Sequence, residues 1–133
     1  MTKQAQLEWY RNQVQLLMQL DQALLQIGST GAPSVARAQQ YQDYTQGTNH
    51  RAAAALQRWE GLIQRREAYA RTVAEHKEEE LKIISLAEDD RTLMILMLYY
   101  LHGLTDQEIA DQLFISREQA NKRRNAFLRT LTD

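Results

Sequence analysis

The chain contains no cysteine and only one proline, five glycines and three histidines among its 133 residues. Without cysteine it forms no disulfide and has no thiolate to bind a metal or attack a substrate. His50, His76 and His102 lie far apart in the sequence, which leaves few groups for metal binding or acid–base catalysis. We therefore expect a protein that is not an enzyme, with no catalytic residue, metal site or cofactor.

The sequence also lacks a long apolar segment. It has no run of about 18 apolar residues, the length that a membrane-spanning helix requires, and no secretory leader pattern. A hydrophobic fraction of 44% and a net charge of −1 are typical of one or two small globular domains. We expect a cytoplasmic protein that does not contact a membrane.

Positive charge is concentrated near the end of the chain. Residues 116–131 contain five basic side chains and one acidic side chain, Glu118, whereas the balancing acids lie upstream. Any contact with nucleic-acid phosphates is therefore expected to come from this segment. Its basic residues are Arg117, Lys122, Arg123, Arg124 and Arg129.

Apolar residues recur with helical spacing in the first two thirds of the chain. In residues 4–27, Leu7, Tyr10 and Val14 mark an apolar stripe with intervals of three and four, which predicts one amphipathic helix. Residues 51–87 carry a broader stripe, interrupted by polar positions, and predict a second, long helix. The sequence shows no strand pattern, so we predict an all-α protein.

Residues 1–87 are predicted to form an N-terminal helical hairpin or coiled-coil-like segment that supplies dimerisation or a partner surface. Between its two helices, residues of about 28–50 have turn formers, many glutamines and no clear period, which predicts a loop. Glu78, Glu79 and Glu80 are consecutive, so their carboxylates project in different directions. We interpret them as a solvated face rather than a cation site.

Residues 88–133 are predicted to form a separate C-terminal module. Asp89 or Asp90 is a suitable N-cap for its first helix, because a short carboxylate accepts hydrogen bonds from the first helical turn. Gly103 would end that helix, since glycine readily adopts the left-handed conformation that follows many helices.

Two capping boxes predict where the next two helices begin. Thr105 is followed three residues later by Glu108, and Ser116 is followed three residues later by Gln119. Two capped helices eleven residues apart, with the small Ala110 where helices must approach closely, are typical of a helix-turn-helix.

The last predicted helix has the chemistry of a helix that reads the major groove. If Ala120 and Phe127 face the core, guanidinium, ammonium and amide groups remain on the outer surface, where they can contact base edges and phosphates. These outward residues are Arg117, Gln119, Asn121, Lys122, Arg124 and Asn125.

Residues 98–131, LYYLHGLTDQEIADQLFISREQANKRRNAFLRTL, resemble without a gap the promoter-reading fourth region of sigma-70-type factors. The resemblance implies a sigma-like helix-turn-helix whose first helix is built by Glu108, Ile109, Ala110 and Leu113. It also implies that one set of side chains faces DNA and that Arg123 reaches the DNA backbone. The DNA-facing set is Arg117, Glu118, Gln119, Asn121 and Lys122.

Two positions depart from that family pattern. Phe114 stands where the family usually has glycine at the turn, so we expect either that the turn avoids a positive φ or that the ring packs. Tyr99 stands where the family usually has arginine. Both changes bear on the geometry of the turn and on how the helices dock.

The whole layout is similar to small phage transcriptional regulators of the ArpU and RinA kind, which are implicated in switching on late genes. This resemblance implies a sequence-specific regulator that binds double-stranded DNA in a bacterial host cell. Because one short helix contacts few base pairs, we expect a homodimer or higher oligomer, or help from host RNA polymerase.

Three other interpretations remain open. The protein can be a small terminase subunit, which joins a helix-turn-helix to oligomerisation helices for DNA packaging. It can imitate a sigma module and bind polymerase without reading DNA, which its acidic residues favour. The basic helix can also be an ordinary, solvated corner of a bundle. The acids in question are Glu88, Asp89, Asp90, Asp106 and Asp111.

Overall fold

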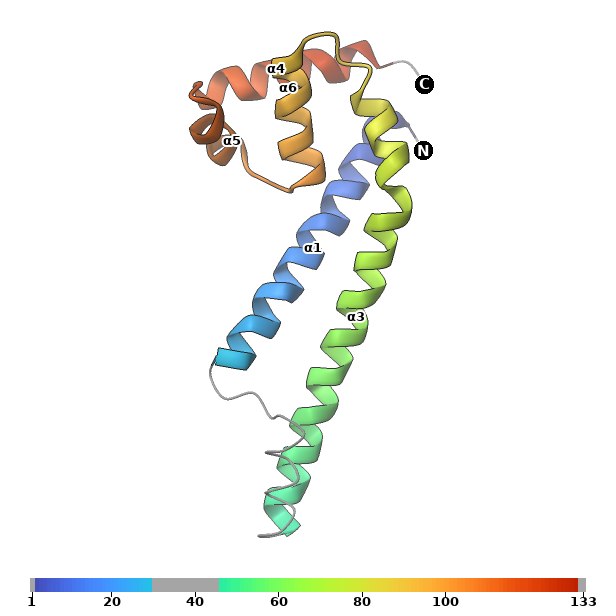
Figure 1. The fold of residues 1–133 in the computed structure, drawn as a ribbon, viewed down its shortest axis with the longest axis vertical. Helices are drawn as coiled ribbons and strands as arrows, with labels where there is room; N and C mark the ends of the chain where they lie inside the picture. The colour runs from blue at the N-terminus through green and yellow to red at the C-terminus, as the bar shows by residue number, and fades with distance from the viewer. Residues whose placement is uncertain (1, 30–45, 132–133) are drawn as a thin grey trace. The chain divides into compact units, whose positions relative to one another are not determined.

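A computed structural model describes residues 2–29 and 46–131 of the chain, and the regular secondary structure in these ranges is helical, with no strand (Figure 1). The all-α prediction is therefore confirmed for this part of the chain. No helix within it is both long and apolar enough to cross a membrane. The elements are α1 (Lys3–Ser29), α3 (Gln46–Ile84), α4 (Asp90–Leu96), the π-helix η1 (Met97–Leu101), α5 (Asp106–Leu113) and α6 (Arg117–Thr130).

The two long helices extend further than predicted at the interior loop. Residues 28 and 29 belong to α1 and residues 46–50 belong to α3, so the loop prediction is wrong at both of its ends. Adding a residue to an existing helix costs far less than nucleating one, which lets helices run into sequence of weak periodicity. Residues 30–45, the rest of that predicted loop, lie outside the described residues.

The chain divides into two compact units, residues 1–16 with 71–133 and residues 17–70. In the second unit, the Nε of Arg66 donates to Oδ1 of Asp21 at 2.6 Å, and this hydrogen bond raises the pKa of Arg66. Arg66, a polar interruption of the α3 stripe, thus has a partner on α1. The domain boundary predicted at residue 88 stays a prediction.

The first unit has a larger apolar cluster to which both ends of the chain contribute. Leu7 of α1 and Ile84 of α3 pack with Tyr100 of η1 and Phe127 of α6. Residues upstream of 88 thus share a core with the C-terminal helices. The buried members are Leu7, Ile83, Ile84, Leu96, Tyr100 and Phe127.

A smaller cluster lies between α4, α5 and α6. Its buried members are Ile95, Ile109 and Ala120, and Leu113 and Ile115 pack against them. Ala120 of α6 meets α4 and α5 here, and its small side chain lets the three helices approach closely. Tyr99 packs against both clusters and so connects the two.

Glu80 corrects the interpretation of the glutamate run as a solvated face. Glu78 and Glu79 are exposed, but Glu80 is fully buried, and its carboxylate oxygens have no hydrogen-bond partner among the described residues. The physical reason is spacing, because Glu80 lies three and four residues before Ile83 and Ile84 of the larger cluster. Burial raises the pKa of Glu80 to about 7.

The buried carboxyl predicts a loss of stability as the pH rises from about 5 to about 8. The folded-state pKa of Glu80 is raised to about 7 from 4.5, so the folded chain holds this proton after the unfolded chain has released it. Its free energy of unfolding therefore falls as the pH rises from about 4.5 to about 7, and levels off above that. Glu80→Met should remove this dependence and be more stable than the native chain by about 2 kcal/mol at pH 8, measured by urea unfolding.

Glu79→Gln, at the neighbouring exposed position, is the matched control and should keep the native pH dependence. Equal pH profiles for the native chain and Glu80→Met would show that Glu80 is not the responsible group.

Candidate functional site

The residues that begin α4 and end η1, which continues it, are those predicted from the sequence. Asp89 is the N-cap of α4, and its Oδ2 accepts a hydrogen bond from the backbone N–H of Thr92 at 3.0 Å. Hydrogen bonds from Thr92 hold the pKa of Asp89 below its usual value, and Arg123 lowers it further. Gly103 follows η1 with a φ of 68°, so the predicted left-handed stop is confirmed.

Both predicted capping boxes are present. Thr105 Oγ1 accepts from the N–H of Glu108 at 3.3 Å, and Glu108 Oε1 accepts in return from the N–H of Thr105 at 3.2 Å. Ser116 and Gln119 make the same exchange at 3.1 and 3.4 Å. These reciprocal bonds begin α5 and α6 at fixed residues, with only residues 114–116 between the helices.

The connection between α5 and α6 contradicts both expectations for Phe114. Its φ of 57° and ψ of 43° are left-handed, so the turn does not avoid a positive φ. Its side chain is 94% exposed, so the ring does not pack. Phe114 thus adopts the left-handed conformation that glycine would adopt freely, at a cost of about 1–2 kcal/mol. The next residue, Ile115, packs inward against the smaller cluster.

Arg124 is not on the outer surface, and the prediction that placed it there is wrong. The residue is only 8% exposed, and its Nη1 makes an ion pair with Oδ1 of Asp106 on α5. Its guanidinium carbon lies 3.8 Å from the centroid of the Tyr99 ring. Ala120, Arg124 and Phe127 follow one another at intervals of four and three, so Arg124 shares the core-facing stripe of α6.

Arg11 of α1 completes this arrangement, and sequence reasoning missed it. Its guanidinium carbon also lies 3.8 Å from the centroid of the Tyr99 ring. Its Nε donates to the Tyr99 carbonyl at 3.1 Å and its Nη2 to the Leu104 carbonyl at 3.2 Å. Its position four residues after Leu7 was the available signal. Tyr99, where the sigma-like pattern has arginine, serves as the aromatic partner of two arginines.

Asn121 and Asn125 are half-buried and hydrogen-bonded within the unit. The Nδ2 of Asn121 donates to Oδ2 of Asp106 at 3.2 Å, and the Nδ2 of Asn125 donates to Oδ1 of Asn121 at 2.9 Å. Asp106 therefore accepts from both Arg124 and Asn121. The amide groups of both asparagines, which the sequence predicts on the outer surface, are thus engaged within the protein.

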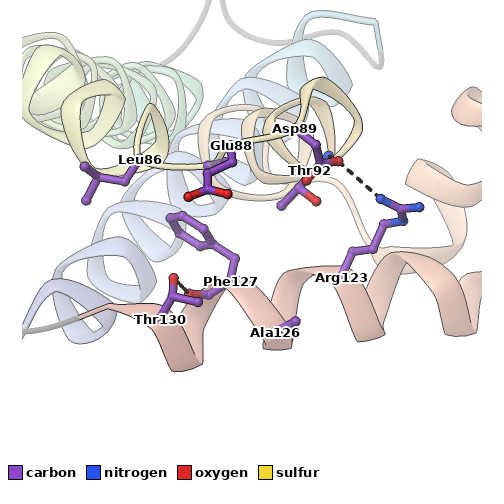
Figure 2. Close-up of a pocket in the computed structure, with 9 residues that line it drawn as sticks. Leu86, Glu88, Asp89, Thr92, Arg123, Ala126, Phe127 and Thr130 are labelled. Carbon is purple, nitrogen blue, oxygen red and sulfur yellow. Dashed lines mark hydrogen bonds and ion pairs between the residues drawn. The ribbon is translucent and has the colours of Figure 1, made fainter.

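Arg123 lies beside an open groove of about 420 Å³ between α6 and residues 86–92 (Figure 2). Its Nη1 donates to Oδ2 of Asp89 at 3.2 Å, and both side chains are about half exposed. An exposed pair of this kind is weak, because solvent screens it and both side chains lose freedom. Arg123 can therefore exchange Asp89 for another anion at little cost.

The remaining predicted residues, Arg117, Glu118, Gln119 and Lys122, are exposed on α6. Among the described residues, neither Arg117 nor Lys122 has an ion-pair partner. One face of α6 combines four polar residues at intervals of four, three and four. It includes Arg129, which is not among the residues predicted to face DNA. The members of this outer face are Glu118, Lys122, Asn125 and Arg129.

The buried ion pair gives a prediction about stability. Asp106→Ala leaves the Arg124 guanidinium buried without its carboxylate, so the free energy of unfolding should fall by about 3 kcal/mol. Asp111→Ala is the control, since this exposed aspartate of the same helix accepts, among the described residues, from Gln107 alone, and its removal should cost no more than about 0.5 kcal/mol. Urea unfolding followed by circular dichroism measures both, and similar losses in the two variants would contradict the importance of the pair.

Comparison with protein-family models, with curated proteins and with solved structures found no match to this chain. The geometry of α5 and α6 and the chemistry of their exposed side chains are therefore the basis for a functional proposal.

Proposed function

We propose that the chain is a sequence-specific DNA-binding regulator of transcription in which α5 and α6 act as a helix-turn-helix. The observation that carries this proposal is the pair of reciprocal capping boxes, which fixes two closely packed helices and leaves the outer face of α6 polar and basic. Such a helix fits the major groove, where side chains reach base edges. The resemblance to phage regulators extends the proposal to phage late genes.

The contacts divide the α6 side chains into two roles. Arg117, Lys122 and Arg129 are exposed cations that bind phosphates, and Arg123 joins them by exchanging Asp89 for a phosphate. Gln119, with free donors beyond its capping contact, is placed in the first turn of α6 to read a base edge.

Arg124 and Asn121 act differently from the prediction that they contact DNA. Both hydrogen-bond to Asp106, so they set the position of α6 against α5 rather than read a base. They are positioning residues, and a loss of DNA binding after their removal would report on the docking of the helices.

The internal ion pairs also bear on the sigma-mimicking alternative. Two of the acids that favoured it, Asp89 and Asp106, are partners of Arg123 and Arg124. The carboxylate of Asp106 is thereby removed from the exposed acidic surface that polymerase binding would need, whereas Asp89 forms only an exposed pair. DNA binding by the exposed cations of α6 is the better supported function.

Gel shifts on duplexes selected from a random library test the proposal. Arg117→Ala combined with Lys122→Ala should weaken binding to all sequences and reduce the slope of log K against log salt by about 2. Gln119→Ala should instead change which sequence is preferred. Arg58→Ala with Lys77→Ala, two exposed cations of α3, removes the same charge and should leave binding nearly unchanged. Binding that survives the α6 changes would exclude α6 as the DNA-binding helix.

Residues 1–87 are proposed to supply self-association as a helical hairpin. Hydrogen bonds from Tyr10 to the Val73 carbonyl and from Arg66 to Asp21 join α1 and α3, within the first and second units respectively. In the second unit, Leu25 is 72% exposed on α1. We propose that a second copy covers Leu25, and this copy would provide the second reading helix.

Light scattering after size-exclusion chromatography should give the mass of a dimer. Leu25→Glu should shift the mass toward that of a monomer, because it places a charge in the expected contact. Leu86→Glu, at an exposed leucine outside α1, is the control. A strict monomer at all concentrations would reject self-association, and a large ring would favour a terminase subunit.

A further inference from the structure

Phe114 carries two features that its own fold does not use. It adopts a left-handed backbone conformation, which glycine would adopt without strain, and it leaves its ring 94% exposed to water. A bulky residue at a positive φ is an outlier, and such outliers concentrate at functional sites. The ring therefore gains nothing within the described chain that offsets either feature.

The turn holds this ring in a defined place. The backbone N–H groups of Phe114 and Ile115 both donate to the Ala110 carbonyl, the latter at 3.1 Å. Ile115 packs against the smaller cluster, and Ser116 begins the second capping box. With its backbone held on both sides, Phe114 extends its exposed ring from a defined position rather than from a loose loop.

The surroundings of the ring are polar. The exposed residues that flank the turn in sequence are Asp111 and Gln112 at the end of α5 and Arg117 to Gln119 at the start of α6. Aromatic anchors of protein interfaces usually lie at the centre of a desolvated apolar patch, which these neighbours do not provide. An isolated ring among charged and amide side chains instead fits a polar partner that offers one apolar group.

We propose that the Phe114 ring contacts a thymine methyl group at the edge of the DNA site, an inference that rests on the proposed function. Phe114 lies three residues before Arg117, so the chain places it within about 10 Å of the first turn of α6. The thymine 5-methyl is the apolar group that the major groove displays, and a phenyl ring recognises it by apolar contact. Phe114 is thus a specificity-determining residue that acts beside the polar reading set.

The test uses the full chain and a duplex recovered from a random library with the native protein. Each thymine is replaced in turn by deoxyuridine, which removes only the methyl group. One replacement should weaken binding by native protein roughly 3- to 10-fold, the effect of losing one buried methyl. Phe114→Gly should lose a similar factor on the unmodified duplex, and the same deoxyuridine should then cost it nothing further.

Stability separates this role from a structural one. Phe114→Gly relieves the backbone strain and should raise the midpoint of urea unfolding, or leave it unchanged, while it lowers affinity. Phe114→Asn, which tolerates the left-handed conformation but has no apolar ring, should show the same loss of affinity. Phe114→Leu is the matched control, since it keeps an apolar contact and should retain part of the sensitivity to deoxyuridine.

Three outcomes would overturn the inference. Native protein could bind its selected duplex with no deoxyuridine position costing more than 2-fold, or Phe114→Gly could keep native affinity. The affinity losses caused by Phe114→Gly and by deoxyuridine could also be fully additive. The ring would then contact something other than that methyl group, such as a protein partner. In each case the native chain still binds DNA, so the proposed function stands, whereas a native chain that binds no duplex fails at the earlier step.

Discussion

The arrangement of the C-terminal helices depends on one carboxylate, that of Asp106 at the start of α5. It accepts from Arg124 and Asn121 of α6, and the Arg124 guanidinium in turn lies over the ring of Tyr99. A buried guanidinium without a carboxylate is costly, so this pair allows few alternative positions of α6 against α5. The angle at which the outer face of α6 is presented follows from this internal charge pair.

The same network connects the start of the chain to the proposed DNA-binding helices. Arg11 of α1 also contacts the Tyr99 ring. It donates to the carbonyls of Tyr99 and Leu104, which lie on either side of Gly103 in the sequence. Leu7, one helical turn earlier, is fully buried in the larger cluster with residues of α3, η1 and α6. The C-terminal helices are therefore supported by α1 and α3, and a fragment that begins at residue 88 would lose part of its core.

Local signals in the sequence were sufficient for the helices and their caps. The capping boxes at Thr105 and Ser116, the N-cap at Asp89 and the stop at Gly103 were predictable because each depends on residues only three or four apart. The burial of Arg124 and Glu80 differs from expectation because charged side chains are usually exposed. Both lie on apolar stripes, so their helical spacing held the correct answer.

Contacts between distant segments could not be predicted in this way. No pattern within α1 indicates that Arg11 meets Tyr99, since the pairing depends on how separate helices dock. The left-handed Phe114 was equally inaccessible, because sequence preference there favours glycine or a packed ring and the chain uses neither. Departures of this kind from local preference are expected where a residue serves an external contact.

The π-helical turn of η1 has a consequence for how this chain should be compared with others. The N–H of His102 bonds to the Met97 carbonyl five residues back, at 3.2 Å, so the turn holds one residue more than an α-helical turn. Removing that residue would rotate everything beyond it by about 100° relative to the helix before it. A protein with a regular α-helix here lacks that extra residue. An alignment to it without a gap would therefore be shifted by one position on one side of the bulge, so that each side chain is matched with the neighbour of its true equivalent.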